Sequence, residues 1–479
     1  MKRPESFMRL MLLAAIAITV AACGRANQKD SLSISYEKYL MPNGLQVILH
    51  QDHSDPVISY AIMYHVGSSR EVPGRTGFAH LFEHLLFTGS ENVPSGAFDR
   101  ILEAAGGSNN GFTNRDVTTY FDVFPKNALE KVLWLESDRM GFFINSVTQR
   151  SLAIQQNVVQ NEKRQYQDNS PYGFTDYVIS KNLYPAGHPY SWEVIGEMED
   201  LRNASLDDVR KYYDTFYGPN NATLVIGGDF DKDTVKVLLD RYFGEIKAHG
   251  EVAARTPMTV TLDAEKRLFH EDNFANVPEL TMVWPVAENY SEDSYPLMFL
   301  ASLLSEGKKA PMYKVLVKEK QLTPNVSVYS NLQELTGEFT LSVTANAGKS
   351  LKEIEEAVIE GFERFETGGF TEKDVERIKA MMERSFYQEL NSVLNKSIQL
   401  AYYNTYLNDP GYIVKDIEKI KAVTPADIMR VYEKYIKGKP RVVTSFVPRG
   451  MTGMMAENSV KAAVSEEDIT KASQVAIDD

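Results

Sequence analysis

This sequence of 479 residues contains a single cysteine, Cys23. One cysteine excludes an intrachain disulfide and argues against a catalytic thiol. The chain also lacks an excess of positive charge, because 51 lysine and arginine residues face 65 acidic residues, for a net charge of −14. That balance argues against nucleic acid or an anionic membrane surface as a partner. An acidic protein would instead suit basic or neutral peptides.

No apolar run is long enough to span a bilayer as a stable helix, since the stretch 10–18 is too short. With Lys2, Arg3 and Arg9 before it, this stretch predicts a secretory signal peptide over residues 1–22. The sequence Ala-Ala-Cys-Gly at 21–24 is similar to a bacterial lipobox, which predicts lipid attachment at Cys23 and a polar tether over 23–32. We therefore expect a lipid-anchored protein of the bacterial cell envelope, in the outer membrane and facing the periplasm. The alternative is an ordinary cleaved signal with an incidental cysteine.

The most informative motif is the run HLFEH at positions 80–84. Helical residues four apart lie one turn apart on the same face, so His80 and His84 can hold one metal ion. Glu83 lies near that face, where a zinc site with an open position needs a carboxylate to take a proton from water. The order H-x-x-E-H is the inverted form of the zinc-peptidase signature. The alternative is an ordinary amphipathic helix with two partly buried histidines.

The surroundings of the motif favour a metal site. The flanking apolar residues would bury the helix without any histidine. We expect Thr76 to cap the start of this helix and Gly89 to follow its end. A catalytic zinc needs a third protein ligand, and no third histidine lies nearby. Glu162 lies on a helix predicted over 148–167, but by itself it is typical of a solvated surface carboxylate.

Several segments together resemble the pitrilysin and insulin-degrading enzyme family of zinc peptidases, which includes the mitochondrial processing peptidase and its bacterial relatives. The run GGSNNGFT at 106–113, followed by Asp116, Thr118 and Tyr120, is similar to the family segment G-G-x-x-N-A-x-T-x-x-D-x-T-x-Y. The run VVQNEKR at 158–164 is similar to the helix that supplies the third zinc ligand. The resemblance extends over about residues 33–448 and is strongest in the first half.

The resemblance implies a role for each matching residue of the metal site. His80, His84 and Glu162 would bind one Zn²⁺ per chain, and Glu83 would be the general base. The family often has a second glutamate two helical turns before the third ligand, where this chain has Gln155. A glutamine can orient a ligand by a hydrogen bond but adds no charge, so zinc affinity could differ.

The resemblance also implies a substrate-binding strand formed by Asn110, Gly111 and Phe112. An edge strand has unpaired backbone groups and can bind an extended peptide without reading much of its sequence. Taken alone, however, the dipeptide Asn110-Gly111 is typical of a turn.

A second departure from the family concerns partners. Members that work alone or as homodimers carry an arginine and a tyrosine, seven residues apart, that hold the substrate carbonyl. Val317 and Pro324 stand at these positions here. Neither side chain can donate a hydrogen bond to an oxyanion. The resemblance therefore implies a heterodimer in which a related subunit supplies the missing arginine and tyrosine.

An internal repeat indicates how the chain is organised. The runs LDDVRKYY at 206–213 and ADIMRVY at 426–432 each precede an apolar strand, and Asp208 and Asp427 are offset by 219 residues. A repeat this long indicates duplicated domains. We expect an α+β fold with two duplicated domains, each a mixed, mostly antiparallel sheet with helices packed on one face, together forming half of a clamshell.

The predicted boundaries follow from this repeat and from composition. A zinc-binding catalytic domain is expected over 33–247, a linker over 248–263 and a second homologous domain without metal over 264–448. One long helix is expected over 372–395, and a flexible tail over 449–479.

These observations predict a zinc metalloendopeptidase or oligopeptidase that hydrolyses unfolded peptides as the catalytic subunit of a heterodimer. The alternative is a non-catalytic relative that serves as a peptide-binding or assembly subunit. A third hypothesis, a lipoprotein that only sequesters zinc, would leave Glu83 dispensable.

Overall fold

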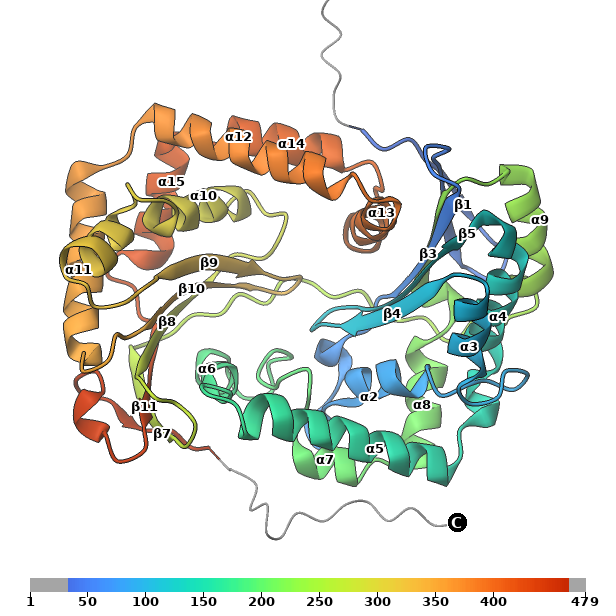
Figure 1. The fold of residues 1–479 in the computed structure, drawn as a ribbon, viewed down its shortest axis with the longest axis horizontal. Coiled ribbons are helices and arrows are strands. Elements are labelled where there is room, and N and C mark those ends of the chain that lie inside the picture. The colour runs from blue at the N-terminus through green and yellow to red at the C-terminus, as the bar shows by residue number, and fades with distance from the viewer. Residues whose placement is uncertain (1–32, 465–479) are drawn as a thin grey trace, which may run out of the picture.

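The structure, a computed structural model, describes residues 33–464. The predicted signal peptide, the lipid attachment site Cys23 and the tether lie outside these residues. Two six-stranded sheets form the two halves of the molecule. Figure 1 shows the first half, blue to green, on the right and the second half, yellow to red, on the left. The predicted α+β fold with two duplicated, mostly antiparallel sheets is confirmed.

Five of the six strands follow the same order in the two sheets, whereas the strand at one edge comes from the start of the described chain in the first sheet and from its end in the second. The first contains, in spatial order, β1 (Glu37–Leu40), β2 (Gln46–Gln51), β6 (Ala222–Gly228), β3 (Val57–Tyr64), β5 (Thr118–Pro125) and β4 (Ser108–Thr113). The second contains β12 (Val460–Lys461), β7 (Lys266–Asp272), β11 (Val442–Pro448), β8 (Glu279–Val286), β10 (Gly337–Thr344) and β9 (Ser327–Leu332). β2 pairs with β6 in parallel, as β7 does with β11. The edge strands β4 and β9 therefore occupy equivalent positions.

Helices from each half pack mainly on its own sheet. Those of the first half are α2 (Phe78–Leu85), α3 (Ala97–Ala104), α4 (Leu129–Phe142), α5 (Gln149–Lys163), α6 (Thr175–Leu183), α7 (Met198–Arg202), α8 (Leu206–Phe216) and α9 (Lys232–Phe243). Those of the second half are α10 (Ser294–Ser305), α11 (Leu351–Gly368), α12 (Glu372–Glu389), α13 (Val393–Leu407), α14 (Ile413–Ala422) and α15 (Pro425–Val431), with a π-helix, η6 (Tyr313–Glu319). Residues 248–263 form neither helix nor strand.

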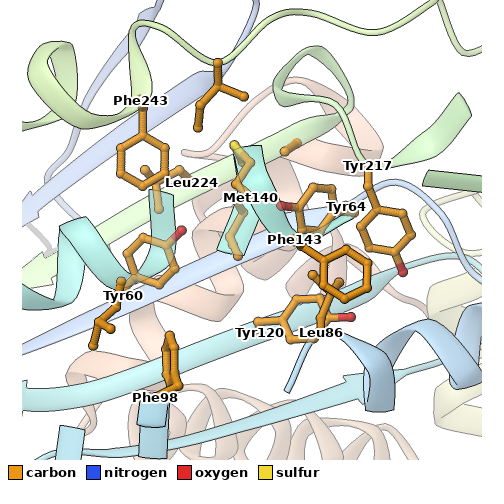
Figure 2. Close-up of a cluster of buried hydrophobic side chains, with 14 of the residues drawn as sticks. Tyr60, Tyr64, Leu86, Phe98, Tyr120, Met140, Phe143, Tyr217, Leu224 and Phe243 are labelled. Atoms are coloured by element: carbon orange, nitrogen blue, oxygen red, sulfur yellow. The ribbon is translucent and has the colours of Figure 1, made fainter. Parts of the chain in front are cut away.

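The core of the first half is rich in aromatic side chains. Tyr60 and Tyr64 of β3 and Tyr120 of β5 point from the sheet into this core, where they lie with Phe143 and Tyr217 (Figure 2). β3 is buried along nearly its whole length, which explains why all of its residues but Ser59 are apolar or aromatic. Strands buried on both faces need a second layer of helices, and the first sheet obtains it from the other half of the chain.

One helix from each half crosses over to cover the sheet of the other half. Leu400, Ala401 and Tyr403 of α13 belong to one apolar cluster with Ile48 of β2 and Val225 of β6. In the opposite direction, α6 contacts strands β8 and β11 of the second sheet. Figure 1 shows α13 beside the first sheet and α6 near the second. Each half therefore has its own helices on one face, as predicted, and a borrowed helix on the other, which was not predicted.

Two predicted boundaries are wrong. The single helix expected over 372–395 is two helices, because α12 ends at Glu389 and α13 starts after Ser392, whose hydroxyl accepts a hydrogen bond from the Asn395 amide. The tail expected from 449 is ordered within the described segment 449–464, where β12 pairs in parallel with β7. Over residues 33–464, no helix is both long and apolar enough to cross a membrane.

Candidate metal centre

The helix α2, which carries both histidines, is fixed at its first turn. Glu71 accepts hydrogen bonds from the backbone amides of Gly77 (2.9 Å) and Ala79 (2.8 Å), two of the amides that have no partner within a helix. Gly77 is the capping residue, with a φ of 83°. A Cβ there would lie 2.8 Å from the Ile195 carbonyl oxygen, so only glycine fits. This arrangement holds the motif rigidly against the rest of the first half.

The predicted cap at Thr76 is wrong. Its hydroxyl donates to Asp200 (2.6 Å) and accepts from the Glu197 amide (2.9 Å), so it joins α2 to the start of α7 instead. The helix ends at Leu85, so Gly89 lies beyond its last turn. The capping role of Glu71 was not predicted, because Glu71 lies six residues before the capping glycine. A capping side chain normally belongs to the residue next to the helix.

Glu162 is held in the last turn of α5, which lies beside α2. α5 begins with a capping box in which the Thr148 hydroxyl accepts from the Ser151 amide. On its buried face, the Gln156 amide donates to the carbonyls of Leu201 (2.8 Å) and Ala204 (2.9 Å). The third predicted ligand therefore comes from a helix that is fixed both at its start and along its length.

The structure brings the three predicted ligands together. The Nε2 atoms of His80 and His84 are 3.3 Å apart, and Glu162 Oε2 lies 3.5 Å from the first and 3.3 Å from the second. Tetrahedral zinc with bonds of about 2.0–2.1 Å to nitrogen and oxygen separates its ligand atoms by about 3.3–3.4 Å. The three side chains thus already have the spacing of three corners of such a tetrahedron. Over residues 33–464, they are the only such group of three.

Electrostatics also suits a cation at this site. Burial lowers the pKa of His80 to about 4, and the neighbouring His84 adds to the shift. At neutral pH this imidazole is therefore neutral and keeps a lone pair for a metal. The side chains are partly open to solvent, with 17% of His80, 21% of His84 and 32% of Glu162 exposed. An open position beside the three donors is what a catalytic rather than a structural site requires.

Glu83 lies on the same helix turn as the histidines and is half-buried. Burial raises the pKa of its carboxyl group, and the negative charge of Glu162 acts in the same direction. A hydrogen bond from Thr113 and the proximity of His84 partly oppose that shift. Thr113 is the last residue of β4, so the candidate base contacts the end of the predicted substrate strand.

β4 is the edge strand of the first sheet, and no other strand among residues 33–464 pairs with its outer side. Asn110, Gly111 and Phe112 all lie within it, so the alternative of a simple turn at Asn110-Gly111 is wrong. The Phe112 ring stacks on Tyr402 of α13, with the ring centroids 6.3 Å apart. A cavity of about 990 Å³ between the two halves begins at Thr113, where the strand ends.

The positions that depart from the family pattern lie as follows. Gln155 is half-buried on α5, two turns before Glu162. Val317 lies half-buried in η6, and Pro324 is exposed in the loop before β9. Neither of the last two side chains carries a hydrogen-bond donor.

Comparison with protein families gives two matches along the chain. The family model described as "Insulinase (Peptidase family M16)" matches residues 46–185, which include the candidate metal centre. The model described as "Peptidase M16 inactive domain" matches residues 203–382, mostly in the half that lacks the three-ligand group.

Similar proteins and structures agree with these matches. The zinc protease PqqE of Helicobacter pylori is 27% identical over 432 residues, covering 89% of this chain and 96% of that protein. The uncharacterised zinc protease YmxG of Bacillus subtilis is 23% identical over 365 residues, covering 75% and 86%. The crystal structure of a protease from Helicobacter pylori superposes with a TM-score of 0.81 at 27% identity, covering 87% of this chain and all of the other. A peptidase M16 inactive domain from Pseudomonas fluorescens shares the fold, with a TM-score of 0.76 at 16% identity, covering 89% and 100%.

Proposed function

This chain belongs to the insulinase family of peptidases, family M16, and we propose that it is a zinc-dependent endopeptidase or oligopeptidase acting on unfolded peptides. The observation that carries the proposal is the spacing of His80, His84 and Glu162, whose donor atoms lie 3.3–3.5 Å apart. Three donors and a neighbouring carboxylate on rigid helices are what metal-assisted hydrolysis needs.

Each residue has a separate task in this proposal. His80, His84 and Glu162 would hold the zinc, which supplies Lewis acidity toward a peptide carbonyl and lowers the pKa of water. Glu83 accepts a proton from the attacking water and returns it to the leaving amine. Burial raises the pKa of Glu83, which makes its carboxylate a stronger base than an exposed glutamate. The outer edge of β4 pairs with the extended substrate backbone.

The missing oxyanion donors support a heterodimer. Val317 and Pro324 offer no hydrogen bond to the substrate carbonyl oxygen, although this role commonly contributes strongly to hydrolysis. A related subunit would supply an arginine and a tyrosine, and it would enclose the bound substrate from the side opposite this chain. Enclosure between two such chains would favour unfolded peptides over folded proteins.

Replacing Glu83 by Gln tests the proposed reaction. The variant should keep its zinc, measured by elemental analysis, because no ligand is changed. Its cleavage of an internally quenched unfolded peptide should fall by about 10²–10⁴-fold, the usual contribution of a general base. Glu418→Gln, which changes an exposed carboxylate of α14 in the second half, is the control and should cleave normally. Full cleavage by Glu83→Gln would refute the role of Glu83, and absence of zinc from the native protein would refute the hydrolase.

The proposed location rests on the lipobox-like sequence around Cys23 and remains a proposal. The lipid-anchored protein would face the periplasm from the outer membrane. Cys23→Ser should move the protein from the membrane fraction to the soluble fraction, because the lipid has no other attachment point. An unchanged distribution between the two fractions would contradict the anchor.

A further inference from the structure

The turn that joins β4 to β5 lies where the two halves of the molecule meet. It comprises residues 114–117 and directly follows Thr113, the residue whose hydroxyl reaches the candidate base Glu83. Within the turn, the Asn114 side chain accepts hydrogen bonds from the amides of Asp116 (2.8 Å) and Val117 (2.9 Å). These hydrogen bonds fix the backbone conformation of the turn. A shift of the turn would therefore also shift the end of β4.

A buried ion pair connects this turn to the second half. Arg115 Nη1 lies 2.8 Å from Glu338 Oε1 on β10, and only 13% and 10% of the two side chains are exposed. The hydroxyl of Tyr184 donates to the same Glu338 oxygen (2.5 Å), and Arg115 also donates to the Ser180 hydroxyl (3.0 Å). The guanidinium lies over the Tyr184 ring, 5.3 Å from its centroid. A buried charge pair with these additional partners has a defined geometry.

The neighbouring residue, Asp116, is held by the same hairpin of the second half. One of its carboxylate oxygens accepts from the Tyr190 hydroxyl (2.6 Å), and the other accepts from the Glu334 amide (3.0 Å). The amide of Leu335 in turn donates to Tyr190 (3.0 Å). Residues 334 and 335 lie in the loop between β9 and β10. Two consecutive residues of the turn thus bind β10 and the loop before it, together with Ser180 and Tyr190 of the first half.

Backbone hydrogen bonds also connect the same turn to the segment before α2, the helix that carries His80 and His84. The amides of Ser68 and Ser69 donate to the carbonyls of Asn114 (3.2 Å) and Arg115 (2.7 Å). Two residues further on, Glu71 caps the start of α2 through the amides of Gly77 and Ala79. The turn therefore lies between the second half on one side and both the edge strand and the metal helix on the other.

We propose that Arg115 and Glu338 are positioning residues for peptide hydrolysis, because their ion pair lets the second half set the position of β4 relative to the metal helix. This inference rests on the proposed function. Arg115 and Glu338 line the cavity between the halves, and a substrate paired with β4 would extend past Thr113 toward them. Loss of the pair should loosen the end of β4 while leaving the three metal ligands in place.

The variant Glu338→Gln removes the charge but keeps the shape, and the chain offers a matched control. Glu355 of α11 pairs with Arg267 of β7 at 2.8 Å, with 13% and 16% of the two side chains exposed. This second pair has similar burial but lies wholly within the second half. Glu355→Gln therefore reproduces the general loss of a buried ion pair without touching the β4–β5 turn.

Two measurements on the full-length, zinc-loaded protein separate positioning from simple stability. Hydrogen exchange over residues 108–117 should be about tenfold faster or more in Glu338→Gln than in Glu355→Gln. With a quenched peptide long enough to pair with β4, KM should rise about tenfold in Glu338→Gln alone, while both variants keep one zinc per chain. Equal exchange over 108–117 in the two variants, or equal changes in KM, would overturn the inference.

A milder variant covers the case in which Glu338→Gln does not fold. Tyr184→Phe removes the hydrogen bond that Tyr184 donates to Glu338 and the one that it accepts from Arg115 (3.2 Å), but it keeps the ion pair, so it should give a smaller change in the same direction. Unchanged exchange over residues 108–117 and unchanged KM in Tyr184→Phe would then overturn the inference. If the native protein cleaves no peptide, the proposed function fails, whereas the hydrogen-exchange comparison still tests the coupling of the second half to β4.

Discussion

At the scale of single residues, the candidate centre depends on side chains outside the motif that reveals it. Glu71 fixes the start of α2, Thr113 reaches Glu83, and the Tyr120 hydroxyl donates to the carbonyl of Phe82 within α2 (3.3 Å). These contacts fix both ends of the short helix that carries His80 and His84. A metal site needs such support because small shifts of its ligands change affinity and activity.

Replacing Glu71 by Ala should therefore weaken the first half of the protein. Two buried backbone amides would lose their acceptor, at a cost of about 2–4 kcal/mol in the free energy of unfolding. Glu71→Gln, which keeps one acceptor oxygen, should lose less. Urea unfolding with a chelator present measures this, because bound zinc would otherwise add its own stabilisation. Equal stability of Glu71→Ala and the native protein would contradict the capping role.

A second residue-scale prediction concerns Asp122, whose carboxyl is fully buried between β5 and α4. Burial raises its pKa well above the ordinary 3.8, the charge of Glu136 raises it further, and Arg139 partly opposes the shift. The folded state thus keeps a proton that the unfolded state releases above pH 3.8. This contribution to stability is complete below that pH and is lost as the pH rises toward the folded-state pKa.

The variant Asp122→Asn should remove this pH dependence, because asparagine resembles the protonated acid. Relative to the native protein, the variant should become more stable as the pH rises above 3.8 toward the folded-state pKa of Asp122, by up to about 1.4 kcal/mol per pH unit. Urea unfolding of both proteins at several pH values measures the difference. A difference that does not change with pH would show that Asp122 is ionised in the fold.

The sequence was sufficient for the parts of the site that depend on local spacing. His80 and His84 share a helix face by periodicity alone, and the family pattern pointed to Glu162 and to β4. Glu71 was missed because it caps α2 from a loop six residues before Gly77, and no local rule connects the two. Asn110-Gly111 shows the opposite case, in which a local turn signal is overridden because the dipeptide pairs with β5.

At the scale of elements, the exchange of α6 and α13 explains why the molecule is one unit. α13 lies against β3 and β6 of the first sheet although its chain neighbours, α12 and α14, belong to the second half. The residues between α12 and α13 contain no proline or glycine, so a break within 372–395 was not predicted. Only the long-range packing against Ile48 and Val225 shows where α13 belongs.

Gly227 of β6 tests this packing, because it allows α13 to approach the sheet closely. A Cβ at this position would lie 2.4 Å from Ser397 Oγ and 3.0 Å from Ser59 Oγ. Those two hydroxyls are 2.7 Å apart and hydrogen-bonded. Gly227→Ala should therefore lower the free energy of unfolding by about 1–3 kcal/mol, the usual cost of overpacking.

The double variant Gly227→Ala with Ser397→Ala is the control for that prediction. Removing the Ser397 hydroxyl makes room for the new methyl group, so the second substitution should recover part of the loss. Urea unfolding of the two single variants and the double variant measures this coupling. If the changes in the free energy of unfolding of the two single variants add up to that of the double variant, the close approach of α13 is not the reason that position 227 requires glycine.

At the scale of the whole molecule, the two sheets share the order of five of their six strands, but the two halves differ in chemistry. Over residues 33–464, only the first half holds a group of three metal-ligating side chains, and the second half contributes α13 and the loop that grips the β4–β5 turn. The second half is therefore suited to restrain the β4–β5 turn of the first half and to form one wall of the cavity between them. Val317 and Pro324, both in the second half, carry no side-chain hydrogen-bond donor.

The lack of hydrogen-bond donors at Val317 and Pro324 leads to a prediction about the proposed heterodimer. If a related subunit supplies these donors, as proposed, the purified chain alone should bind zinc but cleave peptides at least about 100-fold more slowly than the complex with that subunit, because a single missing oxyanion donor costs about 10²–10³-fold in rate. Affinity purification of the native protein, followed by mass spectrometry, should find a related chain with the arginine and tyrosine. Zinc content should be the same with and without that subunit, since all three ligands come from this chain. Equal cleavage by the chain alone and by the complex would refute the heterodimer without affecting the metal site.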